Sequence, residues 1–254
     1  MVWSCLVSIL PGMAQTEKLT DYVNPFVGTD GYGNVYPGAQ IPFGGIQISP
    51  DTDSRFYDAA SGYKYNHLTL MGFSLTHLSG TGIPDLGDFL FIPGTGEMKL
   101  EPGTHEDPDQ GYRSRYSHDK EWASPNYYAV ELADYGVKAE MTSGVRSGMF
   151  RFTYPESDNA FIMIDMNHTL WQSCEWSNLR MINDSTITGY KLVKGWGPER
   201  HVYFTATFSK KLTGLRFVQD KKPVIYNTSR FRSSYEAWGK NLMACISFDT
   251  KAGE

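Results

Sequence analysis

The sequence predicts an all-β protein, specifically a two-sheet antiparallel β-sandwich. Short runs rich in Val, Ile, Phe and Tyr follow one another closely, and each is bounded by Gly, Pro, Asn or Asp. No run longer than about ten residues places apolar side chains at helical spacing. The segment from Tyr235 to Leu242 is a weak helical candidate. Many short strands joined by turns are typical of a sandwich or a barrel.

Residues 1–15 are apolar and uncharged, and they resemble the later part of an export signal. Val2 to Leu10 forms the apolar segment, and the small residues Gly12 and Ala14 stand at plausible cleavage positions. The basic start of such a signal is missing, which leaves a truncated or misassigned start open. The segment is too short to span a membrane. We therefore expect an export leader, a location in the periplasm or at the cell surface, and no transmembrane segment.

Residues 21–89 are dense in Gly and Pro, which break helices and form tight turns, yet they are also rich in aromatic and β-branched residues. This composition indicates an irregular binding surface rather than a solvated linker. Strands are expected at 44–49, 62–65, 69–74 and 88–92, with a turn at 50–53 and a loop at 75–87. The acidic, proline-containing residues 102–110 are expected to form a surface loop.

The pattern becomes more regular after Tyr112. Alternating runs at 127–132 and 137–142 flank Asp134-Tyr135-Gly136 and predict a hairpin. Further strands are expected at 146–153, 160–166, 179–182, 186–191, 201–209, 215–218, 223–226 and 244–249, with a turn at 183–185. The chain ends on a strand and a turn, so we expect residues 20–254 to form a sandwich domain that is incomplete at its C-terminus.

The composition narrows the classes of function. A net charge of −5 argues against a nucleic-acid partner. Aromatic residues make up 14% of the chain, which fits a β-rich core or a carbohydrate site whose Trp and Tyr faces stack on sugars. Composition alone favours the core. Cys5, Cys174 and Cys245 show no metal spacing and no disulfide framework, and whether Cys174 and Cys245 pair stays open.

Two stretches carry candidate site residues. His77-Leu78-Ser79-Gly80-Thr81-Gly82 places an imidazole beside small residues, which suits ligand approach to the backbone but also suits a structural turn. Asn167, His168, Trp171, Glu175 and Trp176 follow a strongly apolar strand and form either a sugar subsite or a packed aromatic corner. Trp196 lies between glycines and should be accessible. Asp51, Asp53 and Asp58 are spaced somewhat like Ca²⁺ ligands, but the closing Gly and Glu are missing, which favours a solvated turn.

Several motifs together resemble glycoside hydrolase family 92. They include Asn24-Pro25-Phe26-Val27-Gly28-Thr29, Tyr36-Pro37-Gly38-Ala39, Ile41-Pro42-Phe43-Gly44, Ser49-Pro50-Asp51-Thr52, Ser61-Gly62-Tyr63, Gly72-Phe73-Ser74 and Thr76 to Gly82. Gly189-Tyr190, Gly195-Trp196 and Val202-Tyr203-Phe204 through Phe208-Ser209-Lys210 continue the resemblance in order. Leu75 stands where many members carry a polar residue, often His, and Tyr57 stands where many carry Trp, so linkage preference is left open.

The resemblance implies the N-terminal domain of a two-domain, calcium-dependent, inverting exo-α-mannosidase of the type common in Bacteroides, acting on N-glycans or mannan. The family's catalytic carboxylates and most of its Ca²⁺ site belong to a C-terminal (α/α)₆ barrel that this chain lacks, so no catalytic or metal-binding residue is assigned here. His77, Ser79, Gly80, Tyr57, Trp171 and Trp196 are the expected contacts to a mannose-containing glycan. The alternative is a stand-alone carbohydrate-binding module without catalysis.

Overall fold

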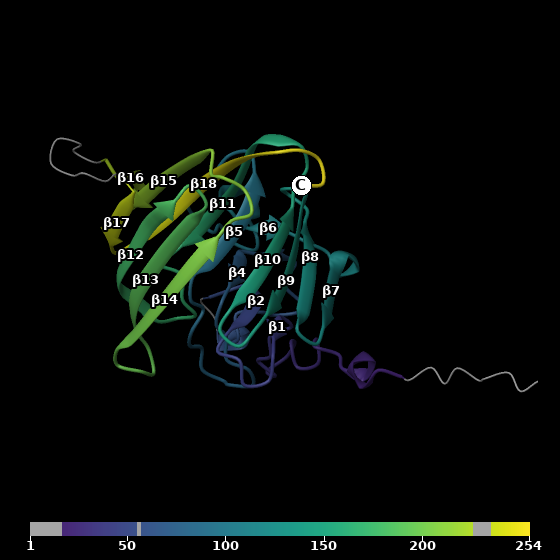
Figure 1. The fold of residues 1–254 in the computed structure, drawn as a ribbon. Coiled ribbons are helices and arrows are strands. Elements are labelled where there is room, and N and C mark those ends of the chain that lie inside the picture. Colours follow the sequence, from purple (N-terminus) through teal and green to yellow (C-terminus); the bar gives the residue numbers. More distant parts are fainter. Residues whose placement is uncertain (1–16, 55–56, 226–234) are drawn as a thin grey trace, which may run out of the picture.

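The computed structural model describes residues 17–54, 57–225 and 235–254, and the predicted leader at 1–15 lies outside this part of the chain. It is built almost entirely of antiparallel strands (Figure 1). No helix within the described residues is long and apolar enough to cross a membrane. This described part of the chain contains four short 3₁₀ helices, η1 (Leu19–Tyr22), η2 (Tyr57–Ala59), η3 (Pro108–Gln110) and η4 (His118–Lys120).

One layer of the sandwich is an eight-stranded sheet in the order β1-β2-β4-β5-β11-β18-β15-β16. Its strands are β1 (Ala39–Gln40), β2 (Gln47–Asp51), β4 (Gly72–Ser74), β5 (Leu90–Thr95), β11 (Ser157–Asp165), β18 (Leu242–Thr250), β15 (Gly214–Gln219) and β16 (Lys222–Pro223). A two-stranded sheet pairs β3 (Thr69–Leu70) with β6 (Ser114–Arg115).

The facing layer consists of two four-stranded sheets (Figure 1). One comprises β10 (Gly148–Thr153), β9 (Val137–Ser143), β8 (Tyr127–Leu132) and β7 (Glu121–Ser124), in that order. The other comprises β14 (Arg200–Thr207), β13 (Thr186–Lys194), β12 (Ser173–Asn183) and β17 (Glu236–Gly239). The predicted sandwich is therefore present, with its second layer divided in two.

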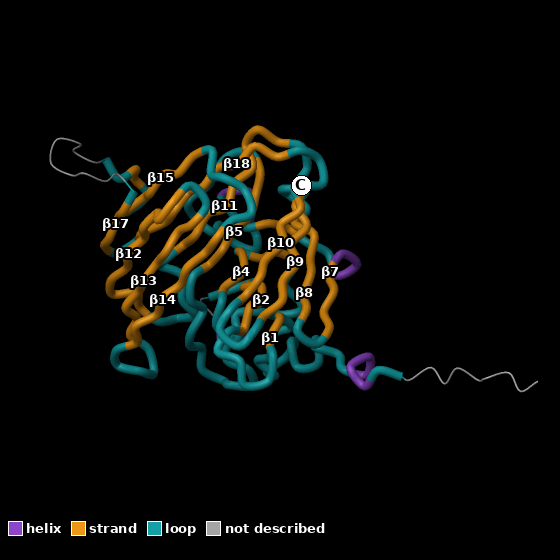
Figure 2. Tube along the Cα trace, viewed as in Figure 1, coloured by secondary structure: helices purple, strands orange, loops and turns teal. Residues whose placement is uncertain are grey.

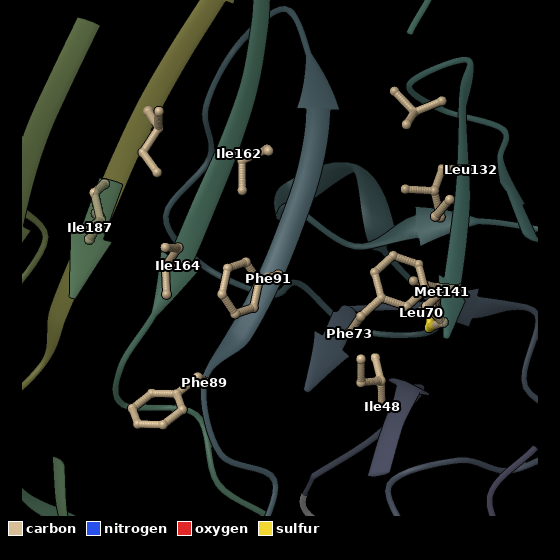
Figure 3. Close-up of a cluster of buried hydrophobic side chains, with 14 of the residues drawn as sticks. Ile48, Leu70, Phe73, Phe89, Phe91, Leu132, Met141, Ile162, Ile164 and Ile187 are labelled. Carbon is tan, nitrogen blue, oxygen red and sulfur yellow. The ribbon is translucent and has the colours of Figure 1, made fainter. Parts of the chain in front are cut away.

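The eight-stranded sheet is buried on both faces, which explains the continuous apolar run Ala160-Phe161-Ile162-Met163-Ile164 in β11. Ile162 and Ile164 point into the main core between the layers, together with Phe73 and Phe91 (Figure 3). Phe161 and Met163 alternate to the opposite face and pack in a second cluster. A strand covered on both sides loses the apolar-polar alternation of a half-exposed strand.

Most predicted strands are present, and three local predictions are wrong. Pro50 and Asp51, predicted to lie in a turn at 50–53, are the last two residues of β2. The segment 235–242, the weak helical candidate, contains β17, because Glu236 to Gly239 pairs with Arg180 to Ser177 of β12. Residues 62–65 form no strand; Gly62 ends a turn at φ +88° and its carbonyl accepts from the Thr52 amide. The 127–132/137–142 hairpin and the 75–87 loop are confirmed. Cys174 and Cys245 are both buried free thiols.

The connections that hold the candidate site residues gather at one end of the sandwich, which we call the loop end (Figure 2). There β5 begins at Leu90, β11 ends at Asp165, β13 ends at Lys194 and β14 begins at Arg200. Antiparallel order brings these termini to the same edge, although they are far apart in the sequence. Residues 75–89, 166–172 and 195–199 therefore meet there.

Gly94 of β5 provides a test of the packing on the outer face of the large sheet. A Cβ at this position would lie 2.4 Å from the Phe161 ring, which is fully buried and has no room to move. We expect Gly94→Ala to lower the free energy of unfolding by about 1–3 kcal/mol, measured by urea denaturation. Gly82→Ala is the matched control, because a Cβ there meets nothing within 4 Å. Equal effects of the two substitutions would contradict this packing.

Candidate functional site

A fully buried carboxylate, Asp51, lies at the centre of the loop end. Its Oδ1 accepts a hydrogen bond from His77 Nε2 at 2.8 Å, and its Oδ2 accepts one from His168 Nε2 at 2.8 Å. The side chains of His77 and His168 are 0% and 4% exposed, so water is excluded from these contacts. We call these three residues the Asp51 cluster. It joins β2 to the loop that follows β4 and to the loop that follows β11.

Local backbone geometry makes room for the Asp51 cluster. Gly62 approaches so closely that a Cβ would lie 2.1 Å from Asp51 Oδ1, and its φ of +88° suits glycine alone. His77 Nδ1 donates to the Gln47 carbonyl at 2.7 Å, so both nitrogens of the His77 ring are engaged. Burial raises the pKa of Asp51, but the attraction of His77 and the hydrogen bonds from both imidazoles outweigh burial and hold that pKa well below its usual range.

A second buried carboxylate, Asp88, binds two cations from the neighbouring sheet. Lys191 Nζ lies 3.1 Å from Asp88 Oδ1, and both side chains are fully buried. Arg200 contacts Asp88 Oδ2, and Thr76 Oγ1 donates to the same oxygen at 2.8 Å. Burial raises the pKa of Asp88, and the two cations overcome this effect and lower it. Lys191 also donates to the His168 carbonyl at 2.6 Å, which links this Asp88 cluster to the Asp51 cluster.

Further hydrogen bonds tie the three loops to one another. Asp85 Oδ2 accepts from the Trp196 amide at 3.0 Å, which anchors the turn between β13 and β14. Gln172 Nε2 donates to the Pro84 carbonyl at 2.7 Å. Gly195 packs against Gln172 and Asp85 with no room for a Cβ. The loop end is therefore one connected unit rather than three independent loops.

A cavity of about 820 Å³ opens beside this unit. Polar groups of Asp165, Asn167 and His168 line it together with the apolar side chains of Met71 and Met243. The Trp171 ring also lines this cavity and is 56% exposed. Such a volume, with a partly apolar lining and several polar groups, suits a small organic ligand or part of a longer one.

Tyr57 and Trp171 form an exposed aromatic pair next to the cavity, with ring centroids 5.3 Å apart. Trp171 adopts a φ of +75°, a conformation that costs a bulky residue about 1–3 kcal/mol. The surrounding contacts of Gln172 hold this conformation in place. A strained backbone that presents an exposed indole is typical of a binding site.

The six predicted site residues do not all gather at the cavity. Trp171 lines it, Tyr57 contacts Trp171, and Trp196 is 60% exposed on the adjacent turn. Ser79 and Gly80 are exposed on the 75–89 loop, where the Gly80 amide donates to the Asn34 carbonyl. These sugar contacts stay predictions. His77 also stays a predicted sugar contact, but its side chain is buried and engaged, so its visible role is to position Asp51.

The described residues contain no group of three or more His, Cys, Asp or Glu side chains able to hold a metal ion. Asp51 and Asp53, interpreted from the sequence as part of a solvated turn, are fully buried, and that interpretation is wrong. Asp51 binds two imidazoles, and Asp53 Oδ2 lies 3.3 Å from His105 Nε2. Carboxylates engaged by imidazoles in this way are poor Ca²⁺ ligands.

Sequence reasoning missed Asp88, Lys191 and Arg200 as a unit. Lys191 and Arg200 follow Asp88 by more than a hundred positions, and no local sequence motif predicts contacts over such a separation. The sequence of β13 contains one signal. Lys191 lies on the same face of the strand as Ile187, Gly189 and Val193, and this face points inward. A lysine at a core position of a strand requires a buried anion as partner.

The sequence matches a known family. A family model described as "Glycosyl hydrolase family 92 N-terminal domain" matches residues 22–254. The chain belongs to glycosyl hydrolase family 92.

Solved family 92 structures share its fold. A family 92 glycosyl hydrolase is 26% identical, with a TM-score of 0.73 over 91% of this chain and 30% of the other. An inverting mannosidase of this family from Bacteroides thetaiotaomicron has a TM-score of 0.74 at 24% identity, over 94% of this chain and 31% of its own. That second likeness concerns the fold.

A curated relative from the fungus Arthroderma benhamiae is described as an uncharacterized secreted glycosidase. It is 30% identical over 139 residues, which are 54% of this family 92 chain and 17% of the relative. The chain thus spans under a third of the length of these family 92 relatives.

Replacement of Asp51 tests the charge at the centre of the site. We expect Asp51→Asn to lower the free energy of unfolding at pH 7 by about 3–5 kcal/mol, because it leaves two buried imidazoles without their anion. Folding lowers the pKa of Asp51, so its stabilisation is present above the ordinary value of 3.8 and is lost as the pH falls through the folded-state pKa.

Urea denaturation between pH 7 and pH 3 measures this effect. The gap between Asp51→Asn and wild type should narrow as the pH falls below about 4. Asp158→Asn on the exposed part of β11 is the control and should follow the wild type throughout. A gap that stays constant with pH would show that the Asp51 charge does not stabilise the fold.

Trp171 offers a test of backbone strain. Both Trp171→Gly and Trp171→Ala remove the ring contact with Tyr57, but only glycine relieves the positive φ. We expect the Gly variant to be more stable than the Ala variant by about 1 kcal/mol, measured by thermal or urea denaturation. Gly variants are usually the less stable ones in ordinary backbone, so the reverse order would argue against strain at this position.

Proposed function

We propose that this chain forms one wall of the substrate cleft of an inverting exo-α-mannosidase that acts on mannose-containing glycans such as N-glycans or mannan. The observation that carries the proposal is the exposed Tyr57–Trp171 pair beside a cavity of about 820 Å³ at the loop end. Family membership supports a glycosidase. The solved inverting mannosidase of the same fold supports the choice of mannose.

The residues of the loop end suit recognition of a sugar. An aromatic face packs against the apolar C–H face of a pyranose ring, and polar groups such as those of Asn167 and Asp165 bind its hydroxyls. Trp196 extends the aromatic surface from the adjacent turn. The Asp51 and Asp88 clusters keep the loops in place, so the rings are oriented before the glycan binds.

The buried carboxylates of the loop end are poorly suited to the chemical step. An inverting glycosidase needs a protonated acid and, on the opposite face of the sugar, a base that activates water. The lowered pKa values of Asp51 and Asp88 keep both ionised at neutral pH, so neither serves as the acid. Both are also enclosed by basic side chains. We therefore place the catalytic acid and base on the C-terminal (α/α)₆ barrel expected in the longer polypeptide.

Calcium dependence and export complete the proposal. Calcium would be bound by the rest of the polypeptide, because the residues described here supply no ligand set. Export to the periplasm or cell surface is supported by the fungal relative, which is described as secreted.

The test compares the 254-residue chain with the polypeptide encoded by the complete reading frame, using release of mannose from mannobiose. We expect the chain alone to be inactive and the longer polypeptide to be active, with activity lost in EDTA and restored by Ca²⁺. Trp171→Ala should raise KM about tenfold, since it removes a ring that contacts the sugar. Trp122→Ala is the control, because Trp122 is also an exposed Trp and lies on β7.

An inactive longer polypeptide would contradict the mannosidase proposal. If the 254-residue chain still bound mannose-containing glycans in that case, the stand-alone binding module would be the correct interpretation. Mannose release by the 254-residue chain would show that its own carboxylates perform the chemistry.

A further inference from the structure

The β14-β13-β12-β17 sheet lies on the left side of Figure 1. Its outer face carries a group of aromatic side chains. Residues directly paired across antiparallel strands share a face of the sheet. One row of paired residues across this sheet is Trp238, Asn178, Tyr190 and Tyr203, and the next row is Trp176, Leu192 and His201. We call these seven residues the aromatic platform.

Exposure confirms that the platform faces solvent in this chain. Trp176, Trp238 and Tyr203 are 47%, 53% and 70% exposed. The alternate residues of the same strands, such as Leu179 and Val193, are fully buried in the opposite direction. The sheet thus presents large rings outward at positions where an antiparallel sheet normally presents small or charged polar groups.

Polar groups lie between the rings and are already oriented. Asn178 Nδ2 donates to Glu236 Oε1 at 3.1 Å, and the Tyr190 hydroxyl lies 2.9 Å from His201 Nδ1. The rings of Tyr190 and Tyr203 pack with centroids 4.8 Å apart. Leu192 is the one aliphatic member of the platform. A surface of rigid rings with hydrogen-bonding groups between them suits a sugar, which offers an apolar C–H face and polar hydroxyl groups.

The spacing of the rings also suits a chain of sugars. Neighbouring strands lie about 4.8 Å apart, so Trp238 on β17 and Tyr190 on β13 are separated by about 10 Å. This separation is comparable with the length of a disaccharide, so alternate units of an extended glycan would meet successive rings. The strands β13 and β14 continue into the turn that carries Trp196, so the platform borders the loop end.

We propose that the aromatic platform is a second glycan-binding surface, which holds an extended, neutral glycan chain outside the cleft. The identification of mannan as the ligand rests on the proposed function. The platform acts by stacking of Trp176, Trp238 and Tyr203 on sugar faces, and Asn178 and His201 bind hydroxyl groups.

Native gel electrophoresis in gels that contain yeast mannan tests this proposal with the 254-residue chain. We expect mannan to slow the wild type, and we expect Trp238→Ala and Trp176→Ala to weaken this retardation about tenfold each. Trp238→Phe should restore most of it, because it keeps an aromatic face. Trp122→Ala on β7 and Thr205→Ala on the same outer face are the matched controls and should behave as wild type. Thermal denaturation of each variant checks that it is folded.

Three outcomes would overturn the proposal. Retardation that survives both platform substitutions but is lost in Trp171→Ala would assign all binding to the cleft and leave the proposed function intact. If mannan does not slow the wild type, glycan binding by the platform is refuted. The proposed function is tested separately by mannobiose hydrolysis with the longer polypeptide. Platform binding that the 254-residue chain shows and the longer polypeptide lacks would identify the platform as a contact surface for the rest of the protein.

Discussion

The carboxylate of Asp51 accepts hydrogen bonds from two imidazoles that lie 26 and 117 positions further along the chain. Most of the loop end depends on this contact. His77 fixes the loop that contains Asp85 and Asp88, and His168 fixes the loop that contains Trp171 and Gln172. Because the three side chains are buried, a change in one partner leaves the others without a substitute from water. Because these buried hydrogen bonds hold the loops in place, otherwise irregular backbone can carry exposed aromatic rings.

Much of the fold could be predicted from the sequence because strands and turns are local patterns. The hairpin around Asp134-Tyr135-Gly136 and the turn at 183–185 follow from turn residues between alternating runs. The division of the second layer into two sheets could not be predicted, because strand order depends on contacts between distant segments. The sequence offers only a weak helical pattern at 235–242, and the segment instead contains a strand because it pairs with β12.

The candidate site was predictable only in part. Trp171 and Trp196 stand out in the sequence as aromatic residues beside turn residues, and the structure brings Trp171 to Tyr57. The local sequence predicts the wrong environment for Asp51, since an Asp after Pro50 has the pattern of a solvated turn, whereas this Asp is fully buried. Its burial follows from His168, which no local pattern connects to it. Residue type thus identified the exposed groups, whereas tertiary contacts alone identified the buried charges that position them.

The order of strands in the large sheet has a consequence for synthesis of the protein. β11 lies at the centre of that sheet, yet one of its two neighbours, β18, follows it in the sequence only after β12 to β17. Until residues 242–250 leave the ribosome, β11 has an unpaired edge made of apolar residues, and such edges favour aggregation. Closure of the sheet by so distant a strand is also slow. Chaperones that cover a nascent edge strand would therefore matter more for this domain than for a sandwich in which neighbours in sequence pair.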